Sequence, residues 1–141
     1  MKIIIIGGVA GGATTAARIR RSDETAEIIL LEKGKYISYA NCGLPYYIGD
    51  VIEEREKLFV QTPEAFGVRF RVDVRTENEV IFIDRKKKTV TVRLKSEDTY
   101  EESYDKLLIS TCASPVRPPL PGIDSTGIFT LRNVADTDRI K

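Results

Sequence analysis

The sequence predicts an α/β fold with a central parallel sheet and an inserted antiparallel β-meander. Residues 2–6 form a continuous, mostly β-branched apolar run, which is typical of a strand buried on both faces of a parallel sheet. Residues 13–21 combine small residues with arginines, which indicates a helix packed closely on that sheet. From residue 79 apolar and polar residues alternate, as they do in antiparallel strands with one solvated face.

Length and composition favour a single soluble, cytoplasmic domain. The chain has 141 residues, of which 42% are hydrophobic and 30% charged, so it can bury a core. Its 22 basic and 21 acidic side chains leave a net charge of +1, so no whole-molecule field favours nucleic acid or an anionic membrane. No apolar run is long enough for a membrane span or a signal peptide. We therefore expect neither a nucleic-acid nor a membrane partner.

The residue types present also argue against metal chemistry. Histidine is absent, which removes imidazole ligands and any Cys-His dyad within the chain. The two cysteines, Cys42 and Cys112, lie far apart and lack the paired spacing of metal sites. We expect no metal, and a reactive sulfur here must be activated by something other than imidazole.

A glycine-rich turn, Gly7–Gly12, follows the first predicted strand. Its glycines stand where a phosphate-binding turn bends and where its helix meets the strand, although Val9 replaces the middle glycine. The N–H groups at the start of the following helix favour phosphate. Glu32 ends the second apolar run, where a carboxylate can accept hydrogen bonds from ribose hydroxyls. These features predict a Rossmann-like dinucleotide site; the alternative is a tight turn that binds nothing beside an ordinary surface carboxylate.

Further along the chain, local patterns predict shorter elements. In order, these are a loop at 35–50 that contains Cys42 and leads into a short helix, a helix from Thr62-Pro63 to about Gly67, strands around 79–82 and 90–94 with a third near Tyr100, a strand at 107–110, and a short strand at 128–131.

Cys42 lies in a turn-forming segment just before the first of these short helices. The N-terminus of a helix stabilises a thiolate, which is the form that attacks a disulfide. A single cysteine is nevertheless more often an inert, buried side chain, and the residues alone leave both readings open. For Cys112 we expect the buried, inert state, with a redox partnership with Cys42 as the less favoured alternative.

Three segments together resemble the pyridine nucleotide-disulfide oxidoreductases that have a single active-site cysteine. They are Gly7–Gly12, Ser38–Tyr46 and Tyr104–Thr111, and the likeness continues to Asp138. Within this family they are most similar to the coenzyme A disulfide reductases and the related persulfide reductases and NADH oxidases.

The resemblance implies an FAD-binding fold and gives roles to individual residues. Cys42 would be the redox-active sulfur, alternating between a thiolate and a mixed disulfide with a small thiol, with Asn41 beside it. Arg18, Arg21 and Ser38 would bind a substrate such as coenzyme A. The residues implied to bind FAD, from its pyrophosphate to its adenosine, are Gly7, Gly8, Val9, Ala10, Gly11, Gly12, Glu32, Lys33, Val80, Ile81, Thr111, Cys112, Ala113 and Arg132.

The implied function is that of the FAD-binding part of an NAD(P)H-dependent disulfide reductase that acts on coenzyme A disulfide or related persulfides. Residues 1–141 would form the N-terminal portion of the FAD-binding domain, with the antiparallel insertion at about 77–104. The NAD(P)H-binding and dimerisation domains of the family are expected to be absent, so the chain alone should be inactive. The full-length enzyme would be a homodimer.

Two departures from the family pattern bear on this reading. Ala10 stands where oxidase and peroxidase relatives tend to carry histidine, which favours a reductase. Cys112 stands where the family strand ends in glycine, which puts the geometry around FAD in doubt. The alternatives are an NADH oxidase, a non-catalytic FAD or adenine-nucleotide binding module, and an ordinary NAD-binding domain.

Overall fold

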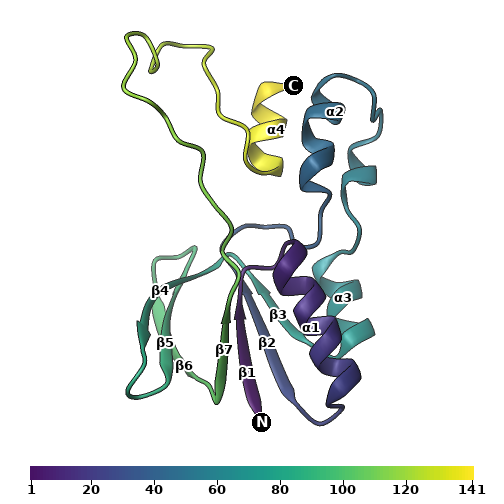
Figure 1. The fold of residues 1–141 in the computed structure, drawn as a ribbon, viewed down its shortest axis with the longest axis vertical. Coiled ribbons are helices and arrows are strands. Elements are labelled where there is room, and N and C mark those ends of the chain that lie inside the picture. The colour runs from purple at the N-terminus through teal and green to yellow at the C-terminus, as the bar shows by residue number, and fades with distance from the viewer. The chain divides into compact units, whose positions relative to one another are not determined.

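The computed structural model describes residues 1–141, which fold into two compact units (Figure 1). Unit one comprises residues 1–39 and 61–111, and unit two comprises residues 40–60 and 112–141. No helix of the chain has both the length and the apolar character that crossing a membrane requires.

Unit one is built on a four-stranded parallel sheet with the strand order β3-β2-β1-β7. The strands are β1 (Lys2–Ile6), β2 (Glu27–Glu32), β3 (Asp73–Thr76) and β7 (Lys106–Ile109). β1 lies between β2 and β7 and pairs with both in parallel register, so its apolar run is buried on both faces as predicted. β3 was not predicted, because Val74 is its one apolar residue.

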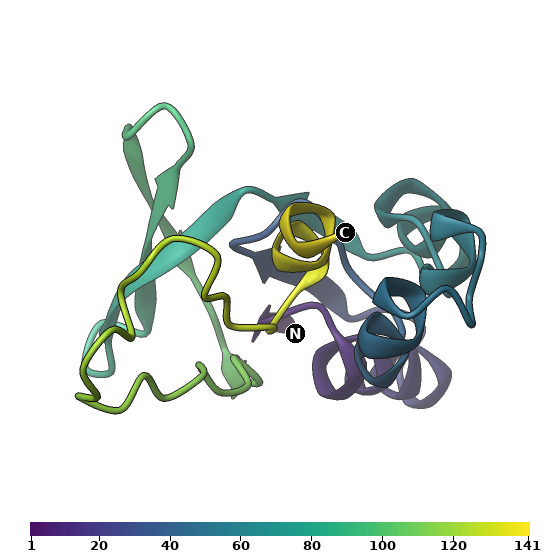
Figure 2. The ribbon, with the colours of Figure 1, turned by 90° about the horizontal axis from the view of Figure 1, so that it is seen from above.

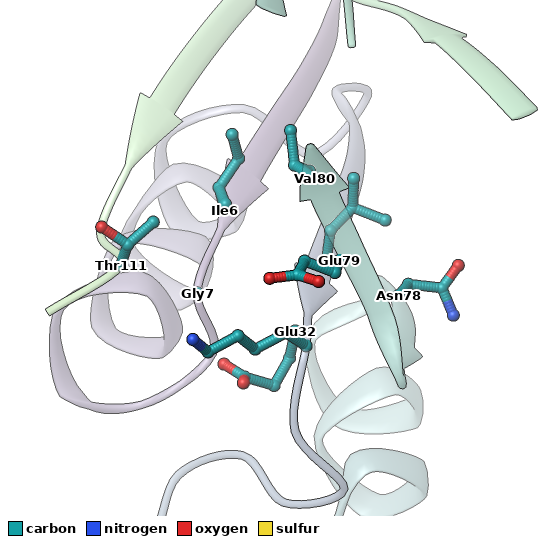
Figure 3. Close-up of a pocket in the computed structure, with 9 residues that line it drawn as sticks. Ile6, Gly7, Glu32, Asn78, Glu79, Val80 and Thr111 are labelled. Atoms are coloured by element: carbon teal, nitrogen blue, oxygen red, sulfur yellow. The ribbon is translucent and has the colours of Figure 1, made fainter. Parts of the chain in front are cut away.

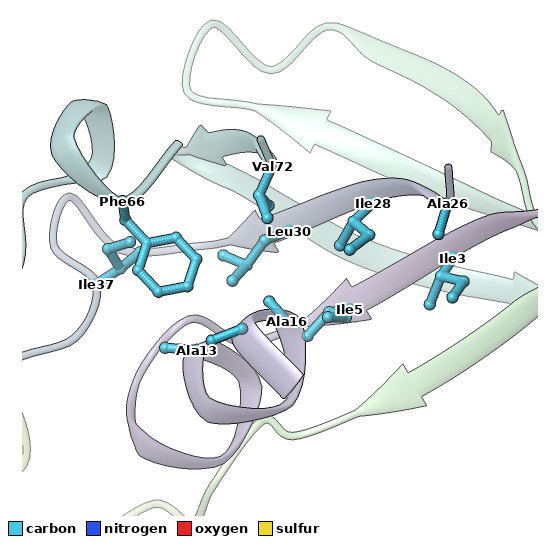
Figure 4. Packing of buried hydrophobic residues seen from close by; sticks show 11 residues of the cluster. Ile3, Ile5, Ala13, Ala16, Ala26, Ile28, Leu30, Ile37, Phe66 and Val72 are labelled. Carbon is cyan, nitrogen blue, oxygen red and sulfur yellow. The ribbon is translucent and has the colours of Figure 1, made fainter. Parts of the chain in front are cut away.

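Two helices, α1 (Ala10–Ser22) and α3 (Pro63–Phe70), pack on one face of this sheet. The buried alanines of α1, among them Ala13 and Ala16, let the helix approach the strands closely (Figure 4). They contact a cluster that includes Ile5 from β1. α1 starts earlier than the sequence pattern suggested, so the second half of the glycine-rich segment is helical.

A three-stranded antiparallel sheet covers the opposite face, which confirms the predicted β-meander. It consists of β4 (Asn78–Asp84), β5 (Thr89–Leu94) and β6 (Thr99–Ser103), in that order. Val90 and Val92 are fully buried and pack against the β1 and β2 residues that point away from α1. Figure 2 shows the meander and α1 on opposite sides of the parallel strands.

α3 begins where the sequence predicted and ends later. The Ala65 N–H donates to the Thr62 hydroxyl at 3.1 Å, which confirms Thr62 as the cap. The helix continues past Gly67 because Phe66 and Phe70, one turn apart on the core side, pack with their ring centroids 4.7 Å apart. Gly67 suits this interior position because a Cβ there would lie 3.1 Å from the Val72 carbonyl oxygen.

Arg20 ties the ends of α1, β2 and α3 together. Its guanidinium donates hydrogen bonds of 2.7–3.2 Å to backbone carbonyl oxygens that these segments leave without helical or strand partners. The accepting residues are Asp23, Glu24, Ala26, Phe70 and Arg71. Five donors in a fixed planar fork are a property of arginine alone, so lysine cannot reproduce this contact.

Unit two contains two short 3₁₀ turns, η1 (Asn41–Gly43) and η2 (Arg55–Leu58), and two helices, α2 (Leu44–Ile48) and α4 (Val134–Ile140). The predicted strand at 128–131 is wrong, because that segment has no strand partner and leads directly into α4.

α4 was not predicted; a capping box between Asn133 and Asp136 fixes its start. Further along, Asp138 accepts two hydrogen bonds from the Arg55 guanidinium. Lys141 donates to Asp50 and to the Tyr47 carbonyl oxygen, beside α2. These contacts hold α4 against the segment that follows Cys42.

Candidate functional site

The turn between β1 and α1 has no room for side chains at its first and last glycines. Gly7 has a φ of +98°, and a Cβ there would lie 2.2 Å from the Ser110 carbonyl oxygen. A Cβ on Gly12 would lie 1.8 Å from the Gly7 carbonyl oxygen. Val9 is buried, so its side chain does not cover the turn. The tight turn therefore forms without a middle glycine, and Val9 leaves the backbone of the turn accessible to a ligand.

The N-terminus of α1 opens directly from this turn. No side chain caps the helix, and its first residues, Ala10 and Gly11, are exposed. The backbone N–H groups of the first turn of a helix lack partners within the helix and carry its positive dipole end. This terminus can therefore bind an anionic group such as a pyrophosphate.

Glu32 is anchored beside the same turn. One carboxylate oxygen accepts a hydrogen bond from the Gly8 N–H at 2.8 Å, and the other accepts from the Gly34 N–H at 2.7 Å. A carboxylate oxygen can accept more than one hydrogen bond, so both oxygens retain capacity toward a ligand hydroxyl. The carboxylate is thus fixed in position and can still accept hydrogen bonds from a ligand.

A pocket of about 140 Å³ adjoins Glu32 (Figure 3). It is lined by Ile6, Gly7, Leu31, Glu32, Lys33, Asn78, Glu79, Val80 and Thr111. Five residues predicted to bind a cofactor therefore lie around one cavity, whereas Ile81 is exposed outside it. Glycine turn, open helix terminus, anchored carboxylate and pocket together fit the pyrophosphate and adenosine of a dinucleotide.

Four pocket residues were not predicted as site residues, namely the apolar Ile6 and Leu31 and the polar Asn78 and Glu79. Glu79 accepts a hydrogen bond from the Arg93 guanidinium at 2.7 Å, and Asn78 accepts one from the Tyr100 hydroxyl at 2.8 Å. Both are therefore fixed by the meander. The one sequence signal that Asn78 and Glu79 could line the site was their position immediately before Val80, at the start of the predicted antiparallel insertion.

The residues predicted to bind substrate lie at two places in unit one. Arg18 and Arg21 are exposed on α1 and do not line the pocket. Ser38 has a φ of 47°, and its N–H donates to the Gly8 carbonyl oxygen at 2.9 Å. Ser38 is thus joined to the glycine turn, whereas the two arginines present a separate basic surface.

Cys42 lies in η1, immediately before α2, so the prediction that it precedes a short helix is confirmed. The thiol is exposed. Two backbone hydrogen bonds fix this turn: the Gly43 N–H donates to the Ala40 carbonyl oxygen, and the Ala40 N–H donates to the Leu58 carbonyl oxygen. Gly43 itself is buried. A well-anchored backbone therefore presents an accessible sulfur.

Arg132 brings three predicted residues of unit two together. Its Nε donates to the Ala113 carbonyl oxygen at 2.6 Å, and its Nη1 donates to Asn41 Oδ1 at 3.3 Å. Its backbone N–H donates to the Asp136 carboxylate in the α4 capping box. The guanidinium therefore contacts the residue next to Cys42 along the chain.

The prediction that Cys112 is buried is wrong. The residue is exposed and adopts the left-handed conformation with a φ of 60°. Residues 111–122 are all exposed and form no regular element before residue 121, so no layer of structure covers the side chain. Glycine would adopt this conformation at little cost, whereas cysteine is strained by its Cβ.

Comparison with known proteins agrees with this arrangement. The family model for pyridine nucleotide-disulphide oxidoreductases matches residues 1–141. The chain is 49% identical over 140 residues to the coenzyme A disulfide reductase of Staphylococcus aureus strain JH9; the match includes 99% of this chain and 31% of that relative.

Two solved structures are also similar. The crystal structure of reduced Bacillus anthracis CoADR-RHD matches with a TM-score of 0.96 and 55% identity over 99% of this chain and 25% of its own. The NAD-dependent persulfide reductase from A. fulgidus matches with a TM-score of 0.93 and 38% identity over 99% and 27%. With its full length matched by the family model, the chain belongs to the pyridine nucleotide-disulphide oxidoreductase family.

Proposed function

We propose that this chain is the FAD-binding portion of an NAD(P)H-dependent disulfide reductase that acts on coenzyme A disulfide or a related persulfide through Cys42. One observation carries the proposal. A chain 49% identical to a coenzyme A disulfide reductase combines a dinucleotide pocket at Glu32 with an exposed thiol at Cys42.

The proposed cofactor site follows from the geometry of unit one. The open N-terminus of α1 would hold the pyrophosphate, and the anchored Glu32 carboxylate would accept hydrogen bonds from the adenosine ribose. Val80 and the Asn78–Glu79 pair would border the adenine. When bound, FAD would supply the electrons that a nicotinamide donor provides.

Cys42 would carry out the thiol–disulfide exchange. Its thiolate attacks one sulfur of the disulfide, a new sulfur–sulfur bond forms to Cys42, and the other half leaves as a thiolate. Exposure of the sulfur and the fixed backbone of η1 support this role. Arg18 and Arg21 offer cationic groups for the phosphates of a coenzyme A substrate.

The chain spans only 31% of the length of its Staphylococcus aureus relative, so the activity of a complete enzyme is part of this proposal. Residues 1–141 contain one glycine-rich βα turn, whereas FAD and NAD(P)H each need a dinucleotide site. We therefore propose that the chain alone binds FAD without oxidising NAD(P)H, and that NAD(P)H binding and homodimerisation belong to the complete enzyme.

Titration of the purified chain with FAD, FMN and ADP tests the cofactor site, with flavin fluorescence and calorimetry as readouts. Because FMN lacks adenosine, we expect FAD to bind, ADP to compete with it, and FMN not to bind at concentrations that saturate with FAD. Equal binding of FAD and FMN, or no competition by ADP, would contradict an adenosine site at Glu32.

A non-catalytic adenine-nucleotide module would give the same titrations, and Cys42 separates the two proposals. A reductase fragment forms a mixed disulfide at Cys42 with coenzyme A disulfide, whereas a binding module shows no preference for Cys42 over Cys112. Mass mapping of the modified peptide distinguishes these outcomes.

A further inference from the structure

We propose that Arg55 and Asp138 are positioning residues for Cys42, because their ion pair holds α4 on the segment that supports the Cys42 turn. The pair would thereby fix the orientation in which the thiol meets a disulfide. This inference rests on the proposed role of Cys42 in disulfide exchange. Both residues act through an intermediate element, the 3₁₀ turn η2, which begins with Arg55.

The turn that carries Cys42 packs on η2 and on the residues just before it. The N–H of Ala40, which precedes η1, donates to the Leu58 carbonyl oxygen at 2.7 Å, and the Leu58 side chain is fully buried. A Cβ built on Gly43 would lie 3.3 Å from Ile52 Cδ1 and 3.4 Å from Leu58 Cδ2, so both side chains lie against the backbone of the turn. A shift of η2 would therefore displace η1 as well, because closely packed groups transmit strain.

The Arg55 side chain in turn holds η2 on α4. Its guanidinium donates from Nε and Nη2 to the two carboxylate oxygens of Asp138, at 2.8 and 2.7 Å, and this bidentate geometry fixes the orientation of both side chains. These hydrogen bonds hold the pKa of the Asp138 carboxyl below its usual value, so the carboxylate is charged at neutral pH. The same guanidinium lies 5.3 Å from the centre of the Phe59 ring, directly after η2. One side chain therefore links the two elements.

α4 has anchors besides Arg55, so it can act as the fixed side of this contact. A capping box fixes its start, and Val134 in its first turn is buried. At its other end Lys141 donates to the Asp50 carboxylate at 2.7 Å. Loss of the Arg55–Asp138 pair should therefore release η2 and leave α4 in place.

The ion pair is partly exposed, which limits how much it can stabilise the whole fold. The exposed fraction is 28% for the Arg55 side chain and 40% for that of Asp138. Breaking a pair of this kind changes an equilibrium by up to about fivefold, the equivalent of about 1 kcal/mol. That is enough to redistribute the orientations of one turn and too little to unfold the chain.

The test measures the rates at which Cys42 forms mixed disulfides with coenzyme A disulfide and with the small 2-hydroxyethyl disulfide, followed by the mass of the Cys42 peptide. A large reagent needs the thiol in one orientation, whereas a small reagent needs only an accessible sulfur. Arg55→Gln should lower the rate with coenzyme A disulfide by about fivefold and change the rate with the small reagent by less than about twofold.

Three further variants separate position from charge. Asp138→Ala removes a negative charge, which by itself would speed the reaction with the anionic coenzyme A disulfide, whereas loss of positioning slows it. Lys57→Gln removes a positive charge from η2 and breaks only a contact with the adjacent Glu54, so it should leave both rates unchanged. The double variant Arg55→Gln/Asp138→Ala should be no slower than either single variant, because the same interaction is lost in all three.

Hydrogen exchange reports the intermediate step. The Ala40 amide, which donates to Leu58, should exchange faster in Arg55→Gln than in the unsubstituted chain. The Gly7 amide, which donates to Leu31 in unit one, is the internal reference and should be unaffected. A global loss of stability would accelerate both amides.

An unchanged rate with coenzyme A disulfide in Arg55→Gln, an equal fall in Lys57→Gln, or a faster reaction in Asp138→Ala would overturn the inference while leaving the proposed function intact. Unaltered exchange at Ala40 would do the same. Failure of Cys42 in the unsubstituted chain to react with either disulfide would contradict the proposed function itself, and the inference with it. If Arg55→Gln and Asp138→Ala both unfold the chain, the pair is a general stabilising contact and the inference is wrong.

Discussion

The Glu32 carboxylate is bound by the backbone N–H of Gly8, so the residue that ends β2 is tied to the turn that follows β1. With the second bond from Gly34, the carboxylate spans the two loops that frame the pocket. The link explains how a turn lacking its middle glycine still forms an ordered site. Under the proposed function, ribose recognition and turn geometry would depend on the same side chain.

Replacing Glu32 should therefore weaken both the fold and the cofactor site. In Glu32→Gln the amide NH₂ faces a backbone N–H donor, and one charge-assisted hydrogen bond is lost. We expect a loss of about 2 kcal/mol in the free energy of unfolding and a fall of about tenfold or more in FAD affinity. Urea denaturation and FAD titration measure the two effects. Glu101→Gln on β6 is the matched surface control, and an equal effect there would contradict the assignment.

Cys112→Gly should stabilise the chain. Removing the Cβ at a φ of 60° relieves a strain of about 1–2 kcal/mol, part of which is offset by the greater freedom of glycine in the unfolded chain. We expect a net gain of about 1 kcal/mol in urea denaturation. Cys112→Ala removes the sulfur and keeps the Cβ, so it should give no such gain. Equal effects of the two substitutions would show that the backbone conformation is not the cause.

Arg20→Lys should be strongly destabilising although it conserves charge. Five carbonyl oxygens of three segments lose a common donor, and one ammonium group cannot reach them all. We expect a loss of about 2–4 kcal/mol in the free energy of unfolding. Arg21→Lys, one residue further along α1 and exposed, should change stability by less than about 0.5 kcal/mol. A small effect at Arg20 would mean that the carbonyls are satisfied by water.

Glu102 should make stability depend on pH in the acid range. Partial burial alone would raise the pKa of its carboxyl, but hydrogen bonds and charge attraction from Lys2 and Arg75 outweigh that effect, and the pKa lies below its usual value of 4.5. A carboxyl with a depressed pKa in the folded state stabilises the protein above its unfolded pKa, and the contribution is lost as pH falls through the folded pKa.

The corresponding measurement is urea denaturation of the wild type and of Glu102→Gln between pH 7 and pH 3. We expect the stability difference between them to be largest near neutral pH and to shrink once the pH drops below about 4.5. A difference that is constant over this range would contradict a charged Glu102 in the folded state. Glu24→Gln, at an exposed acid after α1 that forms no ion pair, is the matched surface control.

The parts of the fold that sequence alone could predict are those with a strong local pattern. The isoleucines of β1 and the alternating valines of β5 indicate their own burial, and Thr62-Pro63 marks the start of α3. β3 has almost no apolar pattern. Its place in the sheet comes from pairing with β2, which its own sequence does not indicate. α4 lacks an extended apolar face. Its capping box is local, whereas the ion pairs of Asp138 with Arg55 and of Lys141 with Asp50 join residues that only folding brings together.

The candidate site divides in the same way. Gly7, Gly12 and Glu32 could be proposed from spacing because a βα turn imposes local requirements. Asn78 and Glu79 reach the pocket through long-range pairing, because Thr76 at the end of β3 pairs with Glu32 and β4 pairs with β5. The contact of Arg132 with Asn41 joins residues that are 91 positions apart in the sequence. Cys112 is exposed because no other segment packs over it, and no local sequence pattern indicates whether a distant segment will do so.

The most direct test of the central claim is the reaction of the purified chain with coenzyme A disulfide, followed by mass spectrometry of the intact chain and its peptides. The account predicts that one coenzyme A is attached through a disulfide to Cys42, that one equivalent of coenzyme A thiol is released, and that dithiothreitol reverses the modification. Modification confined to Cys112, or no modification of either cysteine, would contradict Cys42 as the redox centre.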